Sequence, residues 1–182
     1  MSDGLAREHW HPPRDRLAER DPVQLWRARW AMWRGDVQRQ GLASVQEVKR
    51  ISETLRDLSG EELAQRIRRL STQLRFLGDA TPGQSQPEWT AVRDQLLACW
   101  CDMARRVLGM FPHDTQIRAA VEMHNGYLVQ LAPGEGKTLA IGLTAALYAS
   151  AQRPCHIITA NDYLADRDAD SGQLSLPVGQ SA

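Results

Sequence analysis

A five-residue motif, GEGKT, limits what this chain of 182 residues can fold into more than any other part of it. In a phosphate-binding loop, glycines let backbone N–H groups point at phosphate oxygens. A lysine reaches the β- and γ-phosphates, and the next hydroxyl residue binds Mg²⁺. The motif therefore predicts a cofactor-binding site made by Gly134, Glu135, Gly136, Lys137 and Thr138, with Thr138 as the link to Mg²⁺.

The residues on either side of the motif predict a βαβ unit. Tyr127–Leu131 (YLVQL) is typical of a short buried strand, an apolar helix is expected from the loop to about Ala151, and 155–159 (CHIIT) suggests a second strand. The common phosphate loop has glycine where this chain has Leu131, whereas helicase-type loops have it at the position of Gly134. We therefore expect an α/β fold, with a helical region followed by the opening βαβ part of an incomplete, helicase-like P-loop motor domain.

The N-terminal part of the chain predicts a lead-in and then a helix. Residues 1–22 are polar and contain three prolines, which indicates a flexible segment. In 23–40, Trp26, Trp30 and Trp33 share one face of an expected helix, and arginines lie between them. This face either packs on the rest of the protein or meets a membrane interface or a partner, because Trp and Arg suit both surroundings.

Residues 44–77 predict two more helical segments. Ser59 and Glu62 have the spacing of a capping box, so a helix is expected to begin at Gly60. Its apolar residues then follow at intervals of four, three and four, as the buried face of a helix requires. They are Leu63, Ile67, Leu70 and Leu74.

Further helices are expected beyond a loop over 78–88 that is rich in Gly, Pro, Ser and Gln. One runs from about Trp89 to Leu108 and ends before Gly109, and another covers 114–124. The chain should thus have three parts: a flexible lead-in (1–22), a helical region (23–106) and a partial P-loop nucleotide-binding domain (107–182).

Composition excludes several classes of protein. The 22 basic and 22 acidic residues give no net charge, which argues against nucleic-acid binding through bulk charge. Three cysteines are too few for a disulfide framework and fit a reducing compartment. The N-terminus has no apolar run of the secretory kind, and the longest apolar stretch, 139–151, is shorter than the roughly 18 to 20 residues that span a bilayer. We therefore expect a cytoplasmic protein.

Three stretches resemble one known family. They are VLGMFPHDTQ, LAPGEGKT and ITANDYLADRDA, all within 107–169. This region is similar to the start of the first nucleotide-binding domain of SecA, the bacterial preprotein translocase ATPase. The third stretch is more specific to that family than the loop itself. The similarity is weaker over 45–106 and is not evident before Ser44.

The resemblance implies roles for particular residues. It implies that Gln116 reads the adenine base, that Met110 and Phe111 line the base pocket, and that the loop holds ATP or ADP with Mg²⁺. It also implies the membrane protein-export channel and preproteins as partners, with an anionic lipid surface as a further candidate and no nucleic acid. The protein would then lie in the cytoplasm, peripheral at the inner face of the cell membrane.

The chain also departs from the family. Pro133 stands where the family usually has threonine, and proline lacks a backbone N–H. No D-E-x-D box follows the loop, and the arginines of a second motor domain are absent, although such motors need both for hydrolysis. We therefore expect a truncated ATP-binding subunit of protein export that is inactive alone, and we assign no catalytic residue. The alternatives are a non-enzymatic partner-binding module, a degenerate fragment of the motor, or a small ATPase completed by a second chain.

Overall fold

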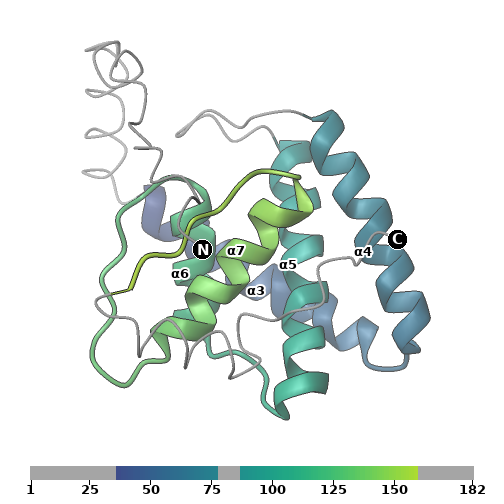
Figure 1. Ribbon diagram of the computed structural model, residues 1–182, viewed down its shortest axis with the longest axis horizontal. Coiled ribbons are helices and arrows are strands. Elements are labelled where there is room, and N and C mark those ends of the chain that lie inside the picture. Colours follow the sequence, from purple (N-terminus) through teal and green to yellow (C-terminus); the bar gives the residue numbers. More distant parts are fainter. Residues whose placement is uncertain (1–35, 78–86, 160–182) are drawn as a thin grey trace, which may run out of the picture.

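The computed structural model describes residues 36–77 and 87–159, and this part of the chain consists of five α-helices and their connections (Figure 1). The expected tryptophan-bearing face and the NDYLADRD stretch lie outside the described residues. The helices are α3 (Asp36–Leu55), α4 (Gly60–Phe76), α5 (Pro87–Leu108), α6 (Asp114–His124) and α7 (Lys137–Ser150).

Helix α5 lies in the middle of the arrangement and packs against α3, α4 and α7, while α6 packs against α3 and α7 (Figure 1). Burial of apolar side chains from all these helices supplies the main driving force for this packing. Trp100 on α5 is the largest fully buried side chain, and its indole N–H donates to Ser150 Oγ of α7 at 3.0 Å. Other core residues include Val48, Leu55, Leu63, Leu96, Leu97, Ile117, Leu143 and Leu147.

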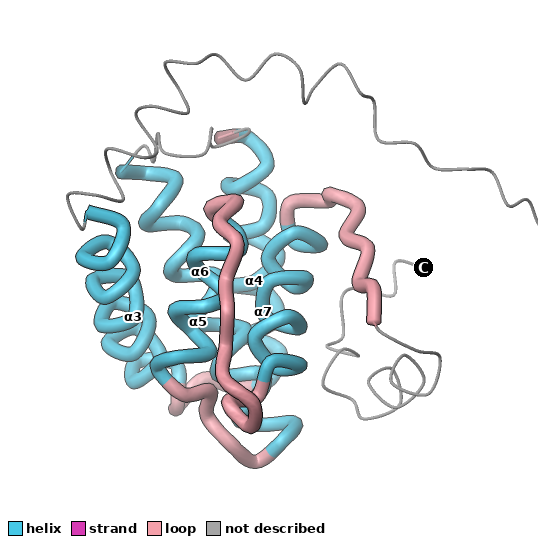
Figure 2. Tube along the Cα trace, turned by 90° about the vertical axis from the view of Figure 1, so that its left-hand side faces the viewer, coloured by secondary structure: helices cyan, strands magenta, loops and turns pink. Residues whose placement is uncertain are grey.

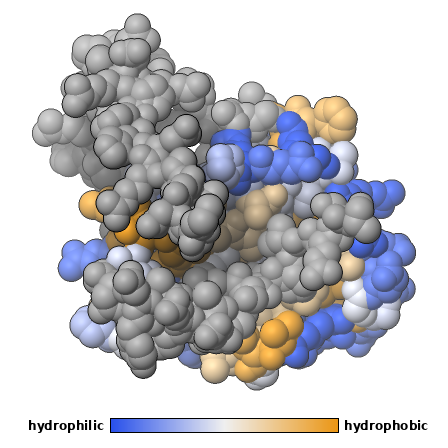
Figure 3. Space-filling model, viewed as in Figure 1, coloured by the Kyte–Doolittle hydropathy of each residue, from blue (hydrophilic) through white to orange (hydrophobic). Residues whose placement is uncertain are grey.

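Helix α4 begins as the sequence predicts. The Ser59 N–H donates to Glu62 Oε2 at 2.7 Å, and the Glu62 N–H donates to Ser59 Oγ at 3.2 Å, so the expected capping box is confirmed. The apolar stripe is confirmed too, because three of its leucines are buried and Ile67 packs against the core. The opposite face exposes Arg68 and Arg69, and Figure 3 shows hydrophilic side chains over this side of the molecule.

Helices α3 and α6 run antiparallel and meet at two points. Lys49 Nζ lies 2.9 Å from Asp114 Oδ1, which joins the C-terminal half of α3 to the start of α6. Two residues before the end of α6, Glu122 lies against Gly41, and a Cβ at Gly41 would overlap Glu122 Oε1. Glycine costs helix stability, so its presence in α3 is explained by this close approach of the two helices.

A buried cluster of hydrogen-bonded polar side chains centres on Arg93 of α5. The Arg93 guanidinium is 2 % exposed and donates to Asp94 Oδ1, Asn125 Oδ1 and Ser44 Oγ. Burial raises the pKa of Asp94, and the adjacent guanidinium opposes that rise. Charged groups this deep are tolerated because they are paired and hydrogen-bonded.

An aromatic stack adjoins that group. The His124 ring packs between Trp89 and Tyr148, with ring centroids 5.2 and 4.9 Å away. Burial, with a smaller contribution from Arg93, lowers the pKa of His124 to about 4.

The expectation of an α/β fold is wrong for the described part of the chain, which is helical and contains no strand. Residues 127–131 and 155–159 are irregular chain, and Figure 2 shows α7 between these two segments. A strand exists only through ladder hydrogen bonds to a neighbouring strand, and no described residue offers one to 127–131. An apolar run such as YLVQL therefore indicates a tendency to form a strand, but it forms no strand in the described part of this chain.

Candidate phosphate-binding site

The predicted loop connects the irregular segment after α6 to the first turn of α7. Gly134 has φ +85° and Gly136 has φ +72°, both in the left-handed region that residues with a Cβ rarely adopt. Gly136 is also the N-cap of α7, with ψ +48°. The two glycines of the motif are therefore required by the turn that brings the chain into the helix.

Backbone donors at the start of α7 have no partner among the described residues. Leu139 and Ala140 donate their N–H groups to Gly136 O, at 3.1 and 3.3 Å. The N–H groups of Gly136, Lys137 and Thr138 have no hydrogen-bond acceptor among the described residues. These donors lie at the positive end of the dipole of a 14-residue helix, where an anion is stabilised.

The side chains of Lys137 and Thr138 complete the cationic and hydroxyl parts of the site. Lys137 is exposed, and its Nζ donates to Ala132 O at 3.2 Å, so the ammonium stays over the loop. Thr138 is half-buried in the first turn of α7, and its hydroxyl forms no hydrogen bond with another described residue. A hydroxyl and an ammonium at these positions suit a phosphate with its Mg²⁺.

Glu135 closes the loop on itself. Its carboxylate accepts the Ala132 N–H at 3.2 Å, while its own N–H donates to Ala132 O at 3.3 Å. The side chain is exposed at the rim of the loop. Pro133, next to Ala132, contributes no donor, so the first half of the loop offers fewer N–H groups than the second.

Gln116 is joined to the loop through both atoms of its amide group. Oε1 accepts the His113 N–H at 2.9 Å, which caps the start of α6. Nε2 donates to Glu135 O at 3.0 Å, and the side chain is buried. The structure thus brings Gln116 together with the loop, at a separation of 19 residues.

The other two residues expected at the base lie in the connection before α6. Met110 is 57 % exposed, and Phe111 is half-buried against the core. Neither of them lines the groove beside the loop. The residues predicted to hold the phosphates therefore lie together in one loop, whereas Met110 is an exposed side chain and Phe111 a ring against the core.

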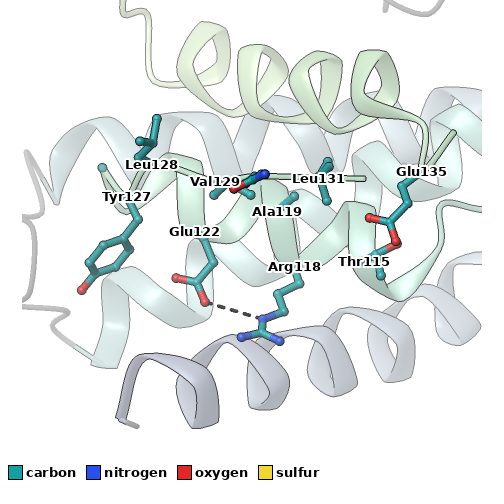
Figure 4. A pocket seen from close by; sticks show the side chains of 11 residues that line it. Thr115, Arg118, Ala119, Glu122, Tyr127, Leu128, Val129, Leu131 and Glu135 are labelled. Atoms are coloured by element: carbon teal, nitrogen blue, oxygen red, sulfur yellow. Dashed lines mark ion pairs between the residues drawn. The ribbon is translucent and has the colours of Figure 1, made fainter. Parts of the chain in front are cut away.

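That groove has a volume of about 790 Å³ and lies between α6 and residues 126–131 (Figure 4). Arg118 and Glu122 extend from α6 toward α3, with Arg118 Nε 3.9 Å from Glu122 Oε1. Burial raises the pKa of Glu122, and its Oε1 has no hydrogen-bond partner among the described residues. Sequence reasoning missed this pair, and its only signal was the i, i+4 spacing of opposite charges.

The described residues lack two other kinds of feature. They contain no cluster of three or more His, Cys, Asp or Glu side chains that could hold a metal ion. Nor does any described helix combine the length and apolarity needed to cross a membrane.

Comparison with known proteins assigns the chain to a family. The model of the SecA DEAD-like domain matches residues 30–175. The match begins before Ser44, where no resemblance is evident by inspection.

Individual relatives agree with the family match. SecA 3 of Mycolicibacterium vanbaalenii is 36% identical over 133 residues, which is 73% of this chain and 15% of the relative. SecA 2 of Mycolicibacterium smegmatis is 48% identical over 86 residues, 47% of this chain and 11% of the relative. SecA of a Synechococcus strain is 33% identical over 138 residues, 75% of this chain and 14% of the relative. All three are called protein translocase subunits, and the aligned part spans about a seventh or less of their length. The chain therefore belongs to the SecA family, and the part of that family it matches is the DEAD-like domain.

Proposed function

We propose that this chain is the ATP-binding start of a SecA-type protein translocase, and that the loop over 132–138 binds the phosphates of ATP or ADP with Mg²⁺. One observation carries the proposal. The N–H groups of Gly136, Lys137 and Thr138 lie at the start of α7 and have no acceptor among the described residues. These N–H groups are open to solvent at the N-terminus of a helix, where a phosphate can take the place of water as their acceptor.

The residues of the loop fit such a ligand. Lys137 would hold the terminal phosphates, the Thr138 hydroxyl would reach Mg²⁺, and the rim carboxylate of Glu135 would stay outside. Mg²⁺ bound with the nucleotide neutralises part of the phosphate charge. On the side of the base, Met110 and Phe111 supply apolar surface, and exposed Met110 is the more accessible of the two.

We further propose binding without turnover for these 182 residues alone. Hydrolysis in motors of this class needs an acidic residue that holds Mg²⁺ and positions the attacking water, and arginines that stabilise the charge of the transferring phosphoryl group. The sequence has no D-E-x-D box after the loop. Those groups would have to be supplied from outside the residues present here.

The relatives' names support a place in protein export, because each is called a protein translocase subunit. We propose that the chain acts in the cytoplasm, peripheral at the inner face of the cell membrane. Its partners there would be the export channel and preproteins, with an anionic lipid surface as a further contact. Nucleic acid is not among the partners we propose, since the net charge of the chain is zero.

Titration of the purified chain with a fluorescent ATP analogue and Mg²⁺ tests the proposal. We expect saturable binding that weakens at least about tenfold in Lys137→Ala, because a charge-assisted contact to phosphate is lost. Lys49→Ala is the matched control: it removes the other lysine of the chain, which forms an exposed ion pair with Asp114. Binding unchanged in Lys137→Ala, or absent in the wild-type chain, would refute the proposed site and favour a module that binds partners only.

A further inference from the structure

We propose that the groove between α4 and α5 is a docking site for an extended acidic segment of a partner protein, and that Arg66 and Arg69 bind the carboxylates of that segment. This surface is separate from the proposed nucleotide site, because no residue of the loop over 132–138 lines the groove. The inference goes beyond the proposed function and does not depend on it.

The groove runs beside α4, which lies at the edge of the described helices and packs against α5 and α7 (Figure 1). Its volume is about 820 Å³, and Leu70 is a buried apolar residue in its lining. Most of the lining is polar, which favours a hydrophilic occupant over an apolar helix. The polar residues are Glu62, Gln65, Arg66, Arg69, Gln73 and Gln95.

The two arginines of the groove have no counter-charge in the part of the chain that the structure describes. Neither Arg66 nor Arg69 forms an ion pair there, whereas the neighbouring Arg68 pairs with Glu61 at 3.1 Å. Arg66 is also half-buried, and a partly desolvated charge without a partner is costly. A guanidinium presents a planar set of N–H donors that matches a carboxylate. The pair therefore favours an anionic group as the occupant.

The charge of Arg66 lies close to the interface between the two helices. Cys99 of α5 is fully buried, and burial raises the pKa of its thiol to about 11, while the positive charge of Arg66 opposes that rise. The guanidinium is therefore within electrostatic reach of the packed face of α5. An anion that binds Arg66 would lie in the groove and not on the outer surface of α4.

The amide side chains of the groove favour a peptide as the anionic occupant. Gln73 and Gln95 form no side-chain hydrogen bond with any other described residue. Each amide can donate and accept, which suits the N–H and C=O groups of an extended peptide backbone. Side chains three residues apart on a helix are roughly 5 to 6 Å apart, and alternate side chains of an extended chain are about 7 Å apart. Carboxylates at alternate positions of a peptide can thus meet Arg66 and Arg69.

Glu62, which also lines the groove, argues against a continuous polyanion. Its carboxylate accepts the Ser59 N–H at 2.7 Å, and this hydrogen bond lowers its pKa, so it carries a negative charge. Nucleic acids and anionic membranes present phosphates at regular intervals, so some of them would meet this carboxylate. A peptide avoids this repulsion when its acidic residues lie at the end of the groove with the arginines.

Fluorescence anisotropy of a labelled peptide, titrated with the full chain, tests the proposal. The peptide has seven residues, with glutamate at the third and fifth positions and threonine, which favours an extended chain, elsewhere. We expect saturable binding that weakens at least about tenfold in Arg66→Gln/Arg69→Gln, because charge-assisted hydrogen bonds are lost. The same peptide with glutamine in place of glutamate should not bind.

Arg68→Gln/Arg75→Gln is the matched control, because it removes the same charge from the side of α4 that faces α7. It should weaken binding by less than about threefold, since exposed charges outside the groove are screened by salt. Equal losses in the two double variants would mean that the peptide is attracted to the total charge of α4, and would overturn the groove as the site.

Reversal of charge separates binding from a structural role. Arg66→Glu/Arg69→Glu should lose the glutamate peptide and gain binding of the matching lysine peptide, which the wild-type chain should not bind. Lack of that gain in a variant with the circular dichroism of the wild type contradicts the proposal. If this variant does not fold, the neutral Arg66→Gln/Arg69→Gln variant decides alone.

Two further results would overturn the proposal. One is the absence of saturable binding of the glutamate peptide to the wild-type chain. The other is binding, through Arg66 and Arg69, of a single-stranded oligonucleotide or of vesicles made of equal parts phosphatidylcholine and phosphatidylglycerol, with no binding of the peptide. Lys137→Ala should bind the peptide as the wild type does, so failure of the proposed nucleotide site leaves this test unaffected.

Discussion

The packed helices and the connection between α6 and α7 are held by different kinds of interaction. In the helices, side chains such as Trp100 and Leu97 are almost completely buried. In the connection, residues 132–137 are exposed, and Leu128 is fully exposed. The helices are fixed by removal of apolar area from water, whereas the loop is fixed by a few hydrogen bonds to Gln116, Glu135 and Lys137. Stability and ligand binding should therefore respond to substitutions in different places.

The largest expected effect is on the packed side of this comparison. Trp100→Ala should lower the free energy of unfolding by about 3 to 5 kcal/mol, because it leaves a cavity between α5 and α7 and removes the bond to Ser150. Urea denaturation followed by circular dichroism measures this. Leu128→Ala is the control from the connection and should change stability by less than about 0.5 kcal/mol. Similar losses in the two variants would break the distinction between the regions.

Acid should lower the stability of the fold by protonating His124, which lies in the aromatic stack at the end of α6. His124 stays neutral in the folded chain down to about pH 4, whereas the unfolded chain binds a proton near pH 6.5. Protonation thus favours the unfolded state, and stability should fall by about 3 kcal/mol as the pH drops through this window. In His124→Phe, which keeps a ring between Trp89 and Tyr148, unfolding midpoints between pH 4 and 7 should depend less on pH. Parallel curves for the two chains would show that another group is responsible.

Substitution of Gly136 in the loop should change stability less than the variants above, but it should strongly weaken nucleotide binding. Gly136→Ala and Gly109→Ala both force a residue with a Cβ into positive φ, at a cost of about 1 to 2 kcal/mol. Only at Gly136 does the added Cβ meet a neighbour, Gln116 Nε2, since nothing lies within 4 Å at Gly109. Binding of the ATP analogue should fall in Gly136→Ala and remain in Gly109→Ala. Equal binding by the two variants would mean that the geometry of the loop start does not matter for the ligand.

The smallest expected effect tests the local signal that begins α4. Ser59→Ala removes the acceptor for the Glu62 N–H and should lower the free energy of unfolding by about 1 kcal/mol, without changing nucleotide binding. Thermal unfolding gives the stability. Ser71→Ala in the middle of α4 is the control, and it should be neutral because alanine favours a helix interior. A change in nucleotide binding in Ser59→Ala would show that α4 and the loop are coupled.

What could be predicted from the sequence follows the same division. The start of α4 and the end of α5 were predictable because their signals are local: the capping box of Ser59 and Glu62, and Gly109 after α5. The division of the chain between 40 and 44 was not correct, because α3 runs without a break over Asp36–Leu55. The strands were not, because strand formation depends on a neighbour that the described residues do not supply to 127–131. The position of GEGKT at the start of a helix was predictable from the motif. The contact between Gln116 and Glu135 was not, because it joins residues 19 apart through a tertiary approach.

The contact between α3 and α6 also constrains the order in which the helices can pack while the chain is being synthesised. Lys49 and Asp114 are 65 residues apart. At roughly 5 to 20 residues per second, α3 leaves the ribosome several seconds before its counterpart on α6 exists. During that interval the surface of α3 around Gly41 has no partner, because α6 has not yet been made. Helix α5 is made before α6 and also packs against α3, so α5 must cover the apolar face of α3 first. The nascent chain should therefore pass through a stage in which α3, α4 and α5 are packed together and the residues of the phosphate loop have not yet been synthesised.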